Sequence, residues 1–222
     1  MNLTLSTIAA MTPEQAAQRD AEVAAYEARQ REAEIFDRYK KSGAPERYWP
    51  ERLETYSVKC EWQEKTVCAC KVFLRDIQSG KFKTLVLLGT PGTGKTHLAC
   101  GLLREYGGKY RTAPDIVEEM RRAKSFTSRD TEKEIIDYYA SVPLLVIDEI
   151  GRGISAADEK YMLYQILNAR YNKRLPTILI SNFGKADFLQ YIGAAAADRL
   201  VESAELLELN GESYRRELRG AN

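Results

Sequence analysis

The feature that most constrains this chain is a short apolar run that ends in a glycine-rich loop. Residues 84–99 read TLVLLGTPGTGKTHLA, in which 85–88 form the apolar run and 89–96 the loop, with the spacing G-x-x-x-x-G-K-T. Glycines allow the backbone to curl so that successive N–H groups converge on an anion, and a helix that begins there adds its partial positive charge. A strand before the loop and a helix after it are the context that this motif requires. The sequence therefore predicts a phosphate-binding loop and a nucleotide-binding protein.

Each residue of the loop has a predicted role in binding the nucleotide or its metal ion. We expect the Lys95 ammonium to reach the β- and γ-phosphates and the Thr96 hydroxyl to bind Mg²⁺. The remaining predicted nucleotide ligands form the curled part of the loop: Gly89, Thr90, Pro91, Gly92, Thr93 and Gly94. A glycine-rich turn without a ligand is the alternative, which the strand before the loop weakens.

A second apolar run ends in two adjacent acids. Residues 143–149 read PLLVIDE, which predicts a buried strand with Asp148 and Glu149 at its carboxyl end. Charge at a buried strand end is costly without a cation. We expect Asp148, with Thr96, to hold hydrated Mg²⁺, and Glu149 to polarise the attacking water as a general base. The acidic pair favours ATP hydrolysis over phosphoryl transfer to a small molecule.

A third buried strand, predicted over residues 175–180, ends in Ser181 and Asn182. Taken alone, Asn182 is only a turn former. At the end of a strand beside the phosphate-binding loop, its amide can hydrogen-bond the γ-phosphate or the attacking water. We therefore expect Asn182 to act as a sensor of the terminal phosphate.

Residues upstream of the loop are candidates for contacts to the nucleotide base. Segments in this position commonly cover the adenine of ATPases with such a loop, which makes Tyr56, Val58 and Gln63 candidates. Packing against the sheet explains each of them at least as well.

Strands and helices alternate along the rest of the chain. Further strands are predicted at 109–112 and 205–209, helices at about 61–77, 95–106, 115–124 and 156–171, a helical or irregular segment at 183–192, and a short helix at 194–197. Such alternation predicts an α/β fold, a parallel sheet flanked by helices with the ligand at its carboxyl edge.

The N-terminal part is expected to be one long helix. Thr12 as N-cap and Pro13 at the first helical position predict a helix from residue 13 to about residue 41. Its charges alternate in sign and its apolar residues are mostly alanine, which leaves too little apolar surface for a core element. It is either a solvated helix with i,i+4 ion pairs or a docking helix for a partner.

A proline-bounded linker, APERYWP at residues 44–50, follows this helix. It marks the predicted boundary between a helical N-terminal segment with its linker, residues 1–50, and an ATPase domain, residues 51–222.

The charge balance leaves nucleic-acid binding to a local patch. Lys+Arg 33 against Asp+Glu 32 give a net charge of +1, so the chain has no global basic field. The basic cluster that includes an aromatic residue is Arg121, Arg122, Lys124, Phe126 and Arg129. Basic side chains follow phosphates and a ring stacks on a base, which is how proteins hold single strands without sequence preference. A solvated helix face is the alternative explanation.

Cysteine spacing and hydropathy argue against two further classes. Cys60, Cys68 and Cys70 lack the C-x₂-C spacing of zinc sites and Cys100 lies far from them, so buried or half-buried reduced thiols are expected. The N-terminus lacks the basic start and apolar core of a signal peptide, and no apolar run has the length of a membrane span. We expect a cytoplasmic protein without membrane contact.

In order along the chain, GTPGTGKT, LLVIDEIG, ILISN, DRL and GESYR resemble the AAA+ ATPases of the DnaC/DnaI helicase-loader type and the related IstB-type transposition helpers. The resemblance covers about residues 53–218. It implies a P-loop AAA+ ATPase domain with a truncated or absent C-terminal lid, preceded by a helical N-terminal segment that binds a partner. The implied cofactors are ATP and Mg²⁺.

The resemblance also implies roles for two arginines. Arg199 in DRL would be an arginine finger that reaches the γ-phosphate bound by the neighbouring subunit, and Arg215 in GESYR a second sensor in the nucleotide site. A finger that acts in trans implies an oligomer, a spiral of ATPase domains on single-stranded DNA. Many loaders carry a second basic residue just before DRL, where this chain has Gly193-Ala194-Ala195-Ala196.

Together these inferences predict an ATP-dependent loader that binds a hexameric replicative DNA helicase through residues 1–50 and delivers it to single-stranded DNA during replication initiation. Hydrolysis of ATP to ADP and phosphate is expected to be slow and stimulated by DNA or the partner. Two alternatives stay open: a transposition helper ATPase that assembles on DNA and directs a transposase, and a nucleotide-switched helicase-binding adaptor with little turnover.

Overall fold

Five short segments, four of them rich in aliphatic residues, form a parallel sheet. The computed structural model describes residues 13–124 and 130–214, and the chain divides into two compact units, Met1–Asp37 and Arg38–Asn222. The strands belong to the second unit: β1 (Thr84–Gly89), β2 (Lys109–Thr112), β3 (Leu145–Ile150), β4 (Thr177–Ser181) and β5 (Ala204–Leu209). Their order is β2-β3-β4-β1-β5, and every adjacent pair is parallel. The predicted α/β fold is confirmed.

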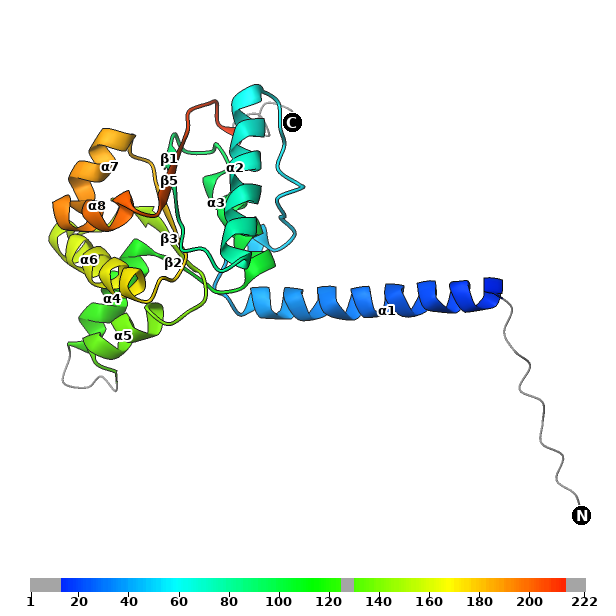
Figure 1. Ribbon diagram of the computed structural model, residues 1–222. Helices are drawn as coiled ribbons and strands as arrows, with labels where there is room; N and C mark the ends of the chain where they lie inside the picture. The colour runs from blue at the N-terminus through cyan, green and yellow to red at the C-terminus, as the bar shows by residue number, and fades with distance from the viewer. Residues whose placement is uncertain (1–12, 125–129, 215–222) are drawn as a thin grey trace, which may run out of the picture. The chain divides into compact units, whose positions relative to one another are not determined.

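Helices cover both faces of the sheet. They are α2 (Glu61–Gln78), α3 (Lys95–Tyr106), α4 (Ala113–Ala123), α5 (Glu132–Tyr139), α6 (Ala156–Asn172), α7 (Lys185–Ile192) and α8 (Ala194–Val201), with a 3₁₀ turn, η1 (Glu46–Tyr48). Helices α2 and α3 lie on one face and α4 to α8 on the other (Figure 1). All six residues of β1 are buried, because this strand lies between β4 and β5 and is covered from both sides.

The sequence located most elements to within two or three residues but missed one helix, α5. Its start is encoded by a capping box: the Thr131 hydroxyl accepts from the Glu134 N–H, and the Glu134 carboxylate accepts from the Thr131 N–H. Thr131 followed three residues later by Glu134 was a readable signal of this helix.

Helix α1 (Pro13–Lys40) has 28 residues and confirms the predicted N-terminal helix to within one residue. The predicted N-cap, Thr12, lies outside the described residues. In the first unit, the side chains of Val23 and Tyr26 are 48% and 64% exposed. No described helix is both long and apolar enough to cross a bilayer.

The second unit begins within the last turn of α1 and includes the 44–50 linker. Tyr39 and Ala44 are buried in it, and the Tyr110 N–H donates to the Ser42 carbonyl at 2.9 Å. The division into residues 1–50 and 51–222 as functional parts remains a prediction.

A buried arginine joins three segments at the edge of the second unit. The Arg170 guanidinium on α6 is 1% exposed and donates to the carbonyls of Tyr139, Val142 and Pro176 at 2.7, 2.9 and 2.5 Å. It also donates to the Thr177 hydroxyl at 2.9 Å. Burial lowers the pKa of Arg170 to about 9, so the side chain stays charged at neutral pH. These bonds connect the end of α5, the start of β3 and the start of β4.

We expect Arg170→Met to lower the free energy of unfolding by at least about 3 kcal/mol, because it leaves several buried carbonyls without a donor. Urea denaturation measures this change. The control Arg75→Met, at an exposed position on α2, should change stability by less than about 0.5 kcal/mol. Equal stability of the two variants would contradict the structural role of Arg170.

Candidate nucleotide-binding site

The loop after β1 adopts a backbone that only glycine accepts without strain. Gly89, Gly92 and Gly94 have φ values of +111°, +88° and +92°, in the left-handed region that L side chains rarely adopt. Gly94 is the N-cap of α3, and a Cβ there would collide with the Tyr56 ring. The predicted phosphate-binding loop is therefore present, with a helix N-terminus at its end.

Lys95 folds back over the inside of this loop. The side chain is 6% exposed, and Nζ donates to the carbonyls of Gly89 at 2.7 Å and Thr90 at 2.8 Å. The side chain thus reaches from the start of α3 back to the first residues of the loop, where the ammonium can interact with an anion bound by the loop.

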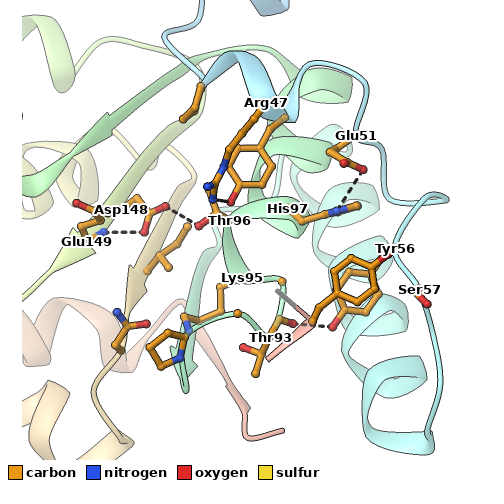
Figure 2. Close-up of a pocket in the computed structure, with 18 of the residues that line it drawn as sticks. Arg47, Glu51, Tyr56, Ser57, Thr93, Lys95, Thr96, His97, Asp148 and Glu149 are labelled. Atoms are coloured by element: carbon orange, nitrogen blue, oxygen red, sulfur yellow. Dashed lines mark hydrogen bonds and ion pairs between the residues drawn. The ribbon is translucent and has the colours of Figure 1, made fainter. Parts of the chain in front are cut away.

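Thr96 and Asp148 meet at the carboxyl edge of the sheet. Thr96 Oγ1 donates to Asp148 Oδ2 at 2.8 Å, and the Glu149 N–H donates to Asp148 Oδ1 at 2.6 Å (Figure 2). Asp148 is only 5% exposed. Hydroxyl and carboxylate oxygens are the ligands that Mg²⁺ prefers, so the pair fits the predicted metal role.

Tyr110 on β2 is a site residue that sequence reasoning missed. Its hydroxyl donates to Asp148 Oδ2 at 2.8 Å. Burial raises the pKa of Tyr110 well above its usual value, and the Asp148 charge raises it further, so the phenol remains a donor at neutral pH. Nothing in the local sequence signals this contact, because it depends on β2 lying beside β3.

A tight turn directs Glu149 into the site. Glu149 has φ +59°, which is uncommon for a non-glycine residue. The fully buried Glu159 carboxylate on α6 accepts from the Gly151 N–H at 2.6 Å and the Gly153 N–H at 3.1 Å. Glu159 therefore fixes the turn that follows Glu149, a second role that the sequence did not reveal.

One cavity of about 720 Å³, a size suited to a nucleotide, is lined by Lys95, Thr96, Tyr110, Asp148 and Glu149. Its walls include loop residues 91–96, Asp148, Glu149 and Asn182. The structure thus brings together the predicted Lys95, Thr96, Asp148, Glu149 and Asn182; their catalytic roles remain predictions.

The opposite wall comes from residues upstream of α2. Tyr56 and Gln63 line the cavity, whereas Val58 is not among the lining residues. The Tyr56 hydroxyl donates to the Thr93 carbonyl at 2.9 Å, and burial raises the pKa of Tyr56 to about 12. Tyr56 therefore fastens this segment to the phosphate-binding loop.

The two arginines implied by the family resemblance differ in what the structure describes. Arg199 on α8 donates to Asn168 Oδ1 at 3.0 Å and pairs with Asp198 at 2.9 Å, and it does not line the cavity of its own subunit. Arg215 lies outside the described residues. The role of each remains a prediction.

The proposed DNA cluster is only partly described. Arg121 pairs with Asp158 at 2.6 Å, Arg122 with Glu118 at 3.0 Å, and Lys124 with Glu132 at 2.9 Å. Phe126 and Arg129 lie outside the described residues. A DNA phosphate would have to compete with these carboxylates, and the contact remains a prediction.

The cysteines are all free thiols, and two differ from expectation. Cys70 and Cys100 are buried, but Cys60 and Cys68 are exposed, because they lie on the outward side at and after the start of α2. Within the described ranges, no group of three His, Cys, Asp or Glu side chains is placed to hold a metal ion.

Comparison with known proteins identifies the family. Residues 71–221 match the family described as IstB-like ATP binding protein. The replicative helicase loader DnaC of Buchnera aphidicola subsp. Schizaphis graminum is 30% identical over 186 residues, covering 81% of this chain and 75% of that protein. The chain belongs to the DnaC/IstB-like family of ATP-binding proteins.

Further members support the assignment to the DnaC/IstB-like family. The replicative helicase loader DnaC of Escherichia coli K12 is 30% identical over 175 residues, covering 76% of this chain and 70% of that protein. A crystal structure of the DnaC helicase loader has the same fold, with a TM-score of 0.66 over 74% of this chain and 99% of that chain at 24% identity. The family is one of ATP-binding proteins, which supports ATP as the predicted cofactor.

We expect Lys95→Ala to lower the affinity for a fluorescent ATP analogue by about 100-fold or more, because it removes a buried charge-assisted contact to the phosphates. Fluorescence titration measures the affinity. Lys133→Ala, at an exposed position on α5, is the matched control and should bind as the unmodified protein does. Unchanged affinity in a folded Lys95→Ala variant would contradict the assignment of the loop.

Proposed function

We propose that this protein is an ATP-dependent loader that binds a hexameric replicative DNA helicase and delivers it to single-stranded DNA. The observation that carries the proposal is the convergence of Lys95, Thr96, Asp148 and Glu149 on one cavity, in a chain 30% identical to replicative helicase loaders over most of its length. An IstB-like role has the weaker support, because the two DnaC loaders match 81% and 76% of this chain, more than the IstB-like family match over residues 71–221.

In the proposed chemistry, the Glu149 carboxylate takes a proton from a water molecule as that water attacks the γ-phosphorus. The bond from the γ-phosphorus to the bridging oxygen breaks, which releases ADP and phosphate. Lys95 and the loop N–H groups neutralise phosphate charge, and Asn182 orients the water or the γ-phosphate. Thr96 and Asp148 would hold Mg²⁺, which when bound supplies positive charge to the phosphate oxygens.

Efficient hydrolysis in this proposal requires a second subunit. Arg199 lies outside the cavity of its own chain. In the proposal, Arg199 acts on the ATP of a neighbouring subunit, so turnover is slow until DNA or the helicase organises the oligomer. Helix α8 begins with Ala194–Ala197 rather than a basic residue, which leaves Arg199 as the proposed finger in this helix.

Helix α1 is the proposed docking element for the helicase. It exposes Val23 and Tyr26, three residues apart, on a helix whose apolar residues are mostly alanine. Large apolar side chains at helical spacing suit a groove on a partner. We propose that the helicase is delivered to single-stranded DNA, and that the basic cluster around Arg121 contacts this DNA.

We expect native mass spectrometry to detect a complex of the protein with its host's replicative helicase in the presence of ATP. Removal of residues 1–37 should abolish the complex, because the cut removes the docking helix and leaves the second unit, which begins at Arg38, intact. Val23→Ala combined with Tyr26→Ala should weaken it, whereas Glu27→Ala on the same helix should not.

A complex that survives the deletion would contradict docking through α1. A protein that does not bind the helicase but assembles on duplex DNA would instead be a transposition helper. Helicase binding that is unaffected by Glu149→Gln, without measurable turnover of the unmodified protein, would indicate an adaptor.

We expect Arg199→Ala and Glu149→Gln each to bind ATP but to lose stimulated hydrolysis. When the two variants are mixed, a site with an intact Glu149 meets an intact Arg199 from its neighbour, so phosphate release should partly recover. Each variant alone at the same total concentration is the control. No recovery in mixed oligomers would rule out action in trans.

A further inference from the structure

The 44–50 linker forms a strap that is fixed to the ATPase core. The Tyr48 N–H donates to the Pro45 carbonyl at 2.9 Å, which forms the 3₁₀ turn η1. Trp49 Nε1 donates to the Ala44 carbonyl at 3.2 Å. From the core, Arg104 on α3 donates to the Trp49 carbonyl at 2.9 Å, and the buried Tyr39 hydroxyl donates to the Tyr48 carbonyl at 3.1 Å. These hydrogen bonds hold the strap, residues 44–50, against the ATPase core at several points.

The strap places one arginine at the cavity. Arg47 lines the cavity together with Thr96, Asp148 and Glu149, and Figure 2 shows Arg47 at the same end of the cavity as Thr96 and Asp148. The guanidinium carbon lies 4.4 Å from the centre of the Tyr48 ring, and the group donates to the Tyr48 hydroxyl. Ring stacking and this hydrogen bond orient the planar fork of the guanidinium.

The other basic residues that line the cavity act from other positions. Lys95 belongs to the phosphate-binding loop and donates to the Gly89 and Thr90 carbonyls. Lys59 lies over the Tyr214 ring at 5.4 Å, and His97 Nδ1 faces the Glu51 carboxylate at 3.3 Å. Arg152 belongs to the turn after Glu149. Arg47 is the cation that the strap brings to the Thr96–Asp148 pair.

The chemistry of this end of the cavity defines what Arg47 can bind. Thr96 and Asp148 would hold Mg²⁺ beside the terminal phosphates of a bound ATP. An arginine fork beside them is suited to two oxygens of the terminal phosphate. ADP has no γ-phosphate and would leave the fork without this partner.

We propose that Arg47 is a γ-phosphate ligand that acts within its own subunit and makes the site selective for ATP over ADP. The inference rests on the proposed function, since it requires ATP in this cavity. It adds that the strap, which follows α1 in the sequence, binds the terminal phosphate together with the phosphate-binding loop and the edge of the sheet.

Isothermal titration with Mg²⁺ tests this inference, using ATPγS and ADP as ligands. We expect Arg47→Met to weaken ATPγS binding about 10-fold or more, the effect of losing a charge-assisted bidentate contact, and to change ADP affinity less than about twofold. Arg47→Lys should restore part of the ATPγS affinity, because a point charge replaces the fork. Arg75→Met, exposed on α2, is the control and should bind both nucleotides as the unmodified protein does.

Hydrogen exchange gives a second readout that folding defects would not reproduce. Amides of residues 44–50 should be more protected with ATPγS than with ADP, and Arg47→Met should remove this difference. Equal weakening of both ligands, or selective weakening in Arg152→Met but not in Arg47→Met, would overturn the proposal. If the unmodified protein binds neither nucleotide, the proposed function fails together with this inference; if it binds both and Arg47→Met leaves their ratio unchanged, this inference alone fails.

Discussion

The buried carboxylate of Asp148 is the interaction on which the rest of the site depends. It stands at the end of β3 and accepts from the Thr96 hydroxyl of α3, the Tyr110 hydroxyl of β2 and the main-chain N–H of Glu149. A buried charge needs such donors, since an unpaired carboxylate in the interior is costly. The donors also place the phosphate-binding loop, the edge strand and Glu149, the proposed general base, around one point.

The second constraint is the shape of the two turns that flank this carboxylate. Glycines give the loop after β1 its left-handed backbone, and the buried Glu159 carboxylate holds the turn after Glu149. Residues before α2 complete the site from outside the sheet: Tyr56 is bonded to the loop, and the strap carries Arg47. ATP would therefore contact the rigid edge of the sheet and also the segment that connects the core to α1.

The parts of this site that are local in sequence were predictable. The phosphate-binding loop and the acidic pair can be recognised in the sequence because each directly follows a short apolar run that predicts a buried strand. The alternation of strands with helices predicts a parallel sheet. Tyr110 and Arg47 could not be found this way, because their contacts depend on strand order and on the path of the strap. In the sequence, Glu159 looks like an ordinary acidic residue of a helix. Its bond from the Gly151 N–H becomes evident only in the folded structure.

The residue types in the sequence were a poor guide to which surface charges are paired. Arg121, Arg122 and Lys124 look like a basic patch in the sequence, yet each is paired with a carboxylate, and one of these carboxylates, Asp158, comes from a distant segment of the chain. Helix α5 was missed although its capping box was visible, because its eight residues are too few for a clear periodicity.

The most direct test of the central claim is transfer of the helicase onto covalently closed single-stranded DNA circles. A closed helicase ring cannot thread onto such a circle, so its retention there after gel filtration reports delivery. The account predicts retention with the protein and ATP, and none with Lys95→Ala or with ATP omitted. Retention that is equal with and without the protein, or that does not require ATP, would contradict it.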